Sequence, residues 1–196
     1  YMYMGKKYVI WEWKHIMEFY ETTLSSKQMF SGNLLKLRVD EVLLPNGRKS
    51  TREIVEHPGA VAVVAITEND EVLMVRQYRK AIERELLEIP AGKLEEGESR
   101  EVCVERELME ETGYFPNELT YLTSFYTSPG FSNEILHLFI AKNLIKKSRD
   151  ADFDEYLQAE KVPFEEAINK IRTGEIVDSK TITGLLLAYD QIKGDL

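Results

Sequence analysis

The segment 92–114, with the sequence GKLEEGESREVCVERELMEETGY, constrains this chain more than any other feature. It predicts a helix over residues 99–112, in which Glu107 and Glu111 lie one turn apart on one face with Glu110 beside them. Like charges at this spacing destabilise a helix by roughly 0.2–0.5 kcal/mol. A hard divalent cation among the carboxylates would offset that loss, because Mg²⁺ prefers oxygen ligands. The pattern therefore predicts a metal site.

Other residues of the segment support this interpretation over that of a solvated acidic helix. Arg106, inside the acidic cluster, can form a forked pair with Glu98 and fix its geometry. Gly92 and Gly97 permit a tight loop before the helix, and Gly113 supplies a stop at its end. An ordinary glutamate-rich helix requires none of these residues.

The same spacing resembles the Nudix box, the signature of a superfamily of hydrolases that split nucleoside diphosphates linked to another group. Eight of the nine fixed positions agree, and Tyr114 replaces the small aliphatic residue usual at the ninth. The resemblance implies an α+β fold, an α/β/α sandwich around a mixed sheet. It also implies Mg²⁺, with Mn²⁺ as the alternative, as the cofactor. The expected metal ligands are the Ala91 carbonyl and the side chains of Glu107, Glu110 and Glu111.

Three flanking motifs resemble the ADP-ribose pyrophosphatase branch of this superfamily. They are Arg76-Gln77-Tyr78-Arg79 with the following Leu87–Gly92 lead-in, Ser128-Pro129-Gly130, and Asp154-Glu155-Tyr156-Leu157. The resemblance implies that Arg79 contacts substrate, that Glu88 helps recognise the base or ribose, and that Glu155 is a mobile catalytic glutamate. Pro129, sixteen residues beyond Gly113, marks this branch.

Each of these motifs has a plainer interpretation. Arg79 could be a surface arginine paired with Glu83, and Pro129 could belong to a simple strand connector. The catalytic base could instead be one of the aspartates near Glu155, namely Asp150, Asp152 and Asp154.

The chain is expected to divide into residues 1–56, a strand region used for dimerisation, and residues 57–196, the hydrolase domain. In the branch it resembles, an N-terminal antiparallel sheet is exchanged between two subunits. This implies a homodimer in which Arg52 touches substrate and Trp11 or Trp13 stacks on adenine. The alternative is that the two tryptophans only pack that interface.

The apolar pattern predicts strands and helices in mixed order. The all-apolar run 60–66 predicts a strand buried on both faces, and the Asn46-Gly47 pair predicts a hairpin turn. Further strands are expected at residues 29–39, 51–55, 71–78, 86–89, 119–125, 135–141 and 156–159, and further helices at 164–172 and 179–193.

Composition excludes several classes of partner. The formal net charge of −9, without a basic run, argues against nucleic acid. No apolar stretch reaches the length of a membrane span, and a signal-peptide pattern is not evident. The single cysteine, Cys103, suits a reducing compartment and a packing role, so we expect a cytoplasmic protein. The three histidines, His15, His57 and His137, show no metal-ligand spacing.

The expected activity is Mg²⁺-dependent hydrolysis of ADP-ribose to AMP and ribose 5-phosphate. One alternative is hydrolysis of another nucleoside diphosphate sugar, such as GDP-mannose. The other is a Nudix-fold sensor that binds ADP-ribose without cleaving it, although such a sensor would be expected to have lost its metal carboxylates.

Overall fold

The computed structural model describes residues 19–147 and 156–194. The chain divides into two compact units, Tyr1–Glu56 and His57–Leu196. Trp11, Trp13 and Glu155, to which the sequence assigned site roles, lie outside the described residues.

The first unit contains a three-stranded antiparallel sheet in the order β1-β2-β3. Its strands are β1 (Thr22–Ser31), β2 (Lys36–Leu43) and β3 (Lys49–Glu56). The Asn46-Gly47 turn joins β2 to β3 as predicted, because Gly47 has φ +80° and its N–H bonds to the Leu44 carbonyl at 2.9 Å. The expected N-terminal antiparallel sheet is confirmed.

The expected single strand at residues 29–39 is wrong. Gly32 donates its N–H to the Leu35 carbonyl at 2.9 Å, and this turn separates β1 from β2. The polar turn residues Gly32 and Asn33 interrupt the apolar pattern there, and they signalled the break.

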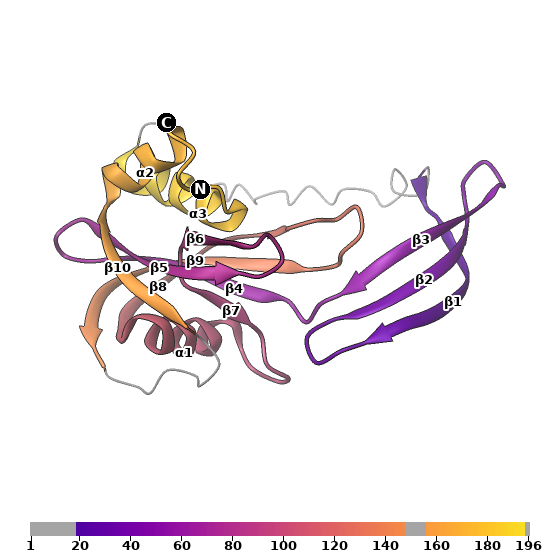
Figure 1. The fold of residues 1–196 in the computed structure, drawn as a ribbon, viewed down its shortest axis with the longest axis horizontal. Coiled ribbons are helices and arrows are strands. Elements are labelled where there is room, and N and C mark those ends of the chain that lie inside the picture. The colour runs from indigo at the N-terminus through magenta and orange to yellow at the C-terminus, as the bar shows by residue number, and fades with distance from the viewer. Residues whose placement is uncertain (1–18, 148–155, 195–196) are drawn as a thin grey trace, which may run out of the picture. The chain divides into compact units, whose positions relative to one another are not determined.

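The second unit is built on a mixed sheet with the strand order β10-β5-β4-β9-β8, to which β6 and β7 add at β5 and β4. The β4–β9 pair is parallel and the other pairs are antiparallel. Helix α1 covers one face, and α2 and α3 cover the other (Figure 1). The elements are β4 (Ala60–Ile66), β5 (Glu71–Arg79), β6 (Arg84–Glu88), β7 (Ala91–Lys93), α1 (Arg100–Thr112), β8 (Tyr114–Tyr126), β9 (Ile135–Lys146), β10 (Leu157–Pro163), α2 (Phe164–Arg172) and α3 (Ser179–Lys193).

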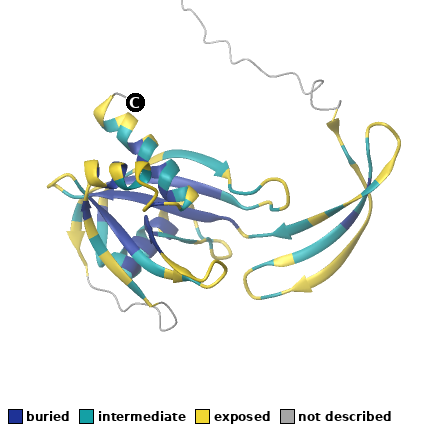
Figure 2. Cartoon of the chain, turned by 45° about the horizontal axis from the view of Figure 1, so that its top comes forward, coloured by how far each residue is buried: buried dark blue, intermediate teal, exposed yellow. Residues whose placement is uncertain are grey.

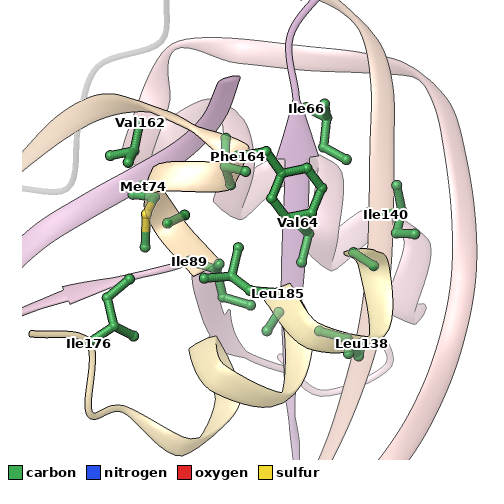
Figure 3. Packing of buried hydrophobic residues seen from close by; sticks show 14 of the residues in the cluster. Val64, Ile66, Met74, Ile89, Leu138, Ile140, Val162, Phe164, Ile176 and Leu185 are labelled. Carbon is green, nitrogen blue, oxygen red and sulfur yellow. The ribbon is translucent and has the colours of Figure 1, made fainter. Parts of the chain in front are cut away.

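Strand β4 is buried along its whole length, as its all-apolar sequence predicts (Figure 2). Its alternate residues face two separate cores. Val64 packs with Leu138 of β9 and Leu185 of α3 on one side (Figure 3). Val63 packs with Leu108 of α1 on the other side. The predicted α/β/α layering around a mixed sheet is confirmed.

Element bounds differ from expectation mainly in the strands. The observed β8 is thirteen residues long and contains a register shift between Tyr121 and Thr123, which divides its apolar pattern. The three-residue β7 carries too little pattern to be recognised in sequence. No helix in the described ranges is long and apolar enough to cross a bilayer.

Candidate functional site

Helix α1 carries the acidic cluster, and a capping residue fixes each of its ends. Ser99 caps its start, its Oγ accepting the Val102 N–H at 3.3 Å. Gly113 ends it in the left-handed conformation, with φ +73°. One face packs Val104 and Leu108 into the core, and this brings Glu107 and Glu111 of the same face under the sheet.

Both of these glutamates are buried, with exposed fractions of 7% for Glu107 and 6% for Glu111. They face the short strand β7. The Ala91 N–H donates to Glu111 Oε2 at 3.1 Å. A Cβ atom on Gly92 would lie 1.9 Å from the carboxylate carbon of Glu107. Gly92 is therefore required by the close approach of Glu107, and its place in β7 leaves the space that this carboxylate fills.

Arg106 lies among the carboxylates of the cluster. Its Nε and Nη2 donate to the two oxygens of Glu98 at 2.9 and 3.0 Å, which is the forked pair expected from the sequence. Its Nη1 donates to Glu107 at 2.8 Å and to Glu110 at 3.0 Å. The hydrogen bonds from Arg106 are the main reason that the pKa of Glu98 is lowered to about 2. Glu98 therefore stays ionised and holds Arg106 in place.

The donor atoms of this region suit a hard divalent cation, because Glu107, Glu110 and Glu111 all offer carboxylate oxygens on one helix. Among the described residues, no three aspartate, glutamate, histidine or cysteine side chains are grouped closely enough to hold a metal ion. Arg106 bonds to two of the glutamates in this arrangement. Each of these hydrogen bonds uses one oxygen of its carboxylate, so Arg106 fixes the orientation of both side chains.

Cys103 belongs to the packing of α1. The side chain is fully buried, and burial is the main reason that the pKa of its thiol is raised to about 12. Its Sγ lies 3.3 Å from the Lys93 carbonyl. A neutral thiol is a poor ligand for a hard cation, in agreement with the packing role expected of Cys103.

A second charged cluster contains Arg79, the last residue of β5, and Glu88, the last residue of β6. Arg79 donates from Nε and Nη2 to the two oxygens of Glu88 at 2.7 and 2.6 Å. Glu88 is completely buried. The alternative pairing of Arg79 with Glu83 is wrong, since Glu83 pairs with Lys80 at 2.6 Å.

The pKa of the Arg79 guanidinium is raised, chiefly by its hydrogen bonds to Glu88. The charges of Asp178 and Glu111 contribute in the same direction. The two clusters are also joined by the chain itself, because Glu88 lies three residues before Ala91, whose N–H donates to Glu111.

The sequence reasoning missed Lys180, in the first turn of α3, which forms an ion pair with Glu88. Its Nζ also lies 3.0 Å from Asp178, the N-cap residue of α3. The sequence Asp178-Ser179-Lys180-Thr181 lies at the predicted start of a helix. It is typical of a helix cap, and this explanation hides the role of Lys180.

Two further predicted site residues are members of neither cluster. Arg52 belongs to β3 in the first unit, where it bonds to Ser50, to the Thr51 carbonyl and to Glu21. Pro129 is exposed in the loop between β8 and β9.

Comparison with known proteins agrees with the fold and the motif. Residues 56–183 match the model of the NUDIX domain, and residues 21–55 match that of the nucleoside diphosphate sugar hydrolase N-terminal domain. A solved structure described as an ADP compounds hydrolase superposes with a TM-score of 0.80 at 23% identity, covering 89% of this chain and 95% of that one. At this identity the match supports the fold alone.

Two relatives are similar over most of their length. The ADP-ribose pyrophosphatase of Bacillus subtilis (strain 168) is 47% identical over 175 residues, which are 88% of this chain and 94% of that protein. The methanol dehydrogenase activator of Bacillus methanolicus is 52% identical over 166 residues, 84% of this chain and 90% of that protein. Together with the domain match and the α1 motif, these similarities show that the chain belongs to the Nudix family.

Proposed function

We propose that this protein hydrolyses ADP-ribose to AMP and ribose 5-phosphate. The observation that carries the proposal is the pair of buried carboxylates, Glu107 and Glu111, packed against β7, which begins three residues after the Glu88 that pairs with Arg79. Buried acidic groups beside a fixed guanidinium suit a diphosphate held together with a cation. The 47% identity to a protein named ADP-ribose pyrophosphatase supports this choice of substrate.

Glu107, Glu110, Glu111 and the Ala91 carbonyl would hold Mg²⁺. When bound, the metal supplies positive charge that neutralises the diphosphate and polarises the phosphorus under attack. Glu98 and Arg106 position this ligand set from outside. Because Gly92 has no side chain, the Glu107 carboxylate can lie directly against β7.

The chain's own residues bind the substrate and move the proton. Arg79 has an exposed side chain and a fixed orientation, so it binds a phosphate oxygen. Glu155 accepts the proton of the attacking water, as the resemblance to the branch implies. In-line attack on one phosphorus breaks the diphosphate bond without a covalent enzyme intermediate, because positioning and charge provide the catalysis.

The first unit serves a second purpose in this proposal. Residues 1–56 form the dimerisation region, and Arg52 with Trp11 or Trp13 completes the adenine pocket of the partner subunit. In support, every residue of β1 is exposed within the single chain, Leu24, Met29 and Phe30 among them. An exposed strand with apolar side chains is prone to association unless it is covered.

A panel of nucleoside diphosphate compounds with Mg²⁺ tests the proposal, with products identified and kcat/KM measured for each. We expect ADP-ribose to have the highest kcat/KM and to yield AMP. The Glu111→Gln variant should lose turnover by orders of magnitude while keeping its fold, since the change removes charge without altering shape. A higher kcat/KM for GDP-mannose would move the assignment to another nucleoside diphosphate sugar. Tight binding of ADP-ribose without turnover would identify a sensor.

A second candidate function is activation of a dehydrogenase, favoured by the 52% identity to a protein named methanol dehydrogenase activator. Adding wild-type protein and the Glu111→Gln variant separately to a methanol dehydrogenase assay tests it. Activation by the wild type alone would mean that it depends on hydrolysis. Activation by both would indicate a binding role, and activation by neither would remove this candidate.

A further inference from the structure

We propose that Lys180, in the first turn of α3, is a positioning residue for substrate binding. It acts through the buried Glu88 to keep Arg79 available for the diphosphate. The inference rests on the proposed function of Arg79 and adds a residue from a helix outside the Nudix motif.

Glu88 is the centre of this arrangement. Its side chain is completely buried, and a buried carboxylate is strongly destabilising unless cations and hydrogen bonds compensate it. Oε1 accepts a hydrogen bond from Arg79 Nε, while Oε2 accepts from both Arg79 Nη2 and Lys180 Nζ. Two cations therefore share one buried carboxylate.

The two cations differ in their exposure. The Lys180 side chain is 12% exposed, whereas that of Arg79 is 41% exposed. Within the described residues, Arg79 Nη1 has no hydrogen-bond partner. The Glu88 fork fixes the guanidinium plane and leaves its outer donors for a ligand oxygen.

Lys180 decides whether Arg79 can serve the ligand. If Arg79 were the only cation beside Glu88, a bound phosphate would offset part of the positive charge of the guanidinium. The buried carboxylate would then have too little positive charge near it. With Lys180 on the same oxygen, Glu88 stays compensated while Arg79 binds phosphate. Lys180 supplies this charge from inside the fold and does not itself touch the substrate.

The first turn of α3 is anchored firmly enough for this role. Asp178 Oδ2 accepts the Thr181 N–H at 2.9 Å and the Thr181 hydroxyl at 2.6 Å. The Thr181 oxygen in turn accepts the Ile89 N–H at 3.0 Å. Ile89, the residue after Glu88, is therefore hydrogen-bonded to the helix that carries Lys180. This bond keeps Lys180 and Glu88 close enough to form their ion pair.

The test measures the Kd of ADP-ribose by calorimetry in EDTA, together with KM and kcat in Mg²⁺. Lys180→Met should raise both Kd and KM by about tenfold, with a smaller change in kcat, because the residue affects binding more than the reacting bond. Lys180→Arg should restore most of the affinity. Lys193→Met is the matched control, since Lys193 forms an exposed ion pair with Asp70 at the other end of α3.

A double-mutant cycle separates this inference from the proposed function. In the Arg79→Ala background, Lys180→Met should cause no further loss of affinity, because its effect passes through Arg79. Additive losses, or a Lys180→Met variant with wild-type Kd, would overturn the inference. If Arg79→Ala alone leaves Kd unchanged, the proposed substrate contact of Arg79 is wrong. Lys180→Gln, which can still donate to Glu88, replaces Lys180→Met if that variant does not fold.

Discussion

Replacing Gly92 by alanine should lower the activity of this protein strongly while changing its stability little. The backbone of Gly92 is not in the left-handed region, so alanine is compatible with its conformation. The added methyl group, however, would lie 1.9 Å from the Glu107 carboxylate carbon. To reach an ordinary contact, the carboxylate must move by roughly 1.5 Å, and it then loses its 2.8 Å hydrogen bond from Arg106.

A displacement of this size should lower kcat/KM by about 100-fold, because catalytic groups must be held to within an ångström of their place. The effect on stability should be small. The obstructing atoms are at the end of a flexible side chain, and alanine is favoured over glycine inside a strand by roughly 0.5–1 kcal/mol. We expect Tm to change by less than about 4 °C.

The assay compares ADP-ribose hydrolysis and thermal unfolding for Gly92→Ala and Gly184→Ala. The control adds the same methyl group in α3, where it would lie 2.8 Å from Ile89 Cδ1 and 3.2 Å from side-chain atoms of Leu138 and Val64. Overpacking there affects stability alone, so activity should persist below the unfolding temperature. Wild-type kcat/KM in Gly92→Ala would refute the assigned role of the Glu107 carboxylate.

Three further predictions concern stability, reactivity and assembly. The folded-state pKa of Glu98, about 2, lies below its usual 4.5, so Glu98 stabilises the fold above pH 4.5 and loses this effect as the pH falls toward 2. Glu98→Gln should therefore lower the free energy of unfolding by about 1–2 kcal/mol in urea at pH 7, after allowance for solvent screening, and by clearly less at pH 3, whereas an equal loss at both pH values would contradict this. The Cys103 thiol, with its pKa raised to about 12 by burial, should react with Ellman's reagent at pH 8 only after unfolding, and fast labelling of folded protein would disprove it. Light scattering should report about twice 22.7 kDa, and mixing Arg52→Ala with Glu111→Gln subunits should restore activity if Arg52 acts across the dimer.

The local sequence was sufficient to predict those features that depend on a single helix, strand or turn. The spacing of Glu107, Glu110 and Glu111 on a helix depends only on helical periodicity. The helix ends at Ser99 and Gly113, and the turn at Asn46-Gly47, depend on local backbone preferences. The β4 strand was recognisable because burial on both faces requires an unbroken apolar run.

Contacts between distant segments were decided only by the tertiary structure. The pairing of Arg79 with Glu88, rather than with Glu83, depends on the register of β5 against β6. The ion pair between Lys180 and Glu88 joins residues 92 positions apart, and no periodicity in the sequence relates them. The cations that pair with a buried carboxylate are those that the tertiary packing places beside it. The motif therefore determined the acidic face of α1 by itself, whereas the packing of α3 against β6 determined which cations complete the site.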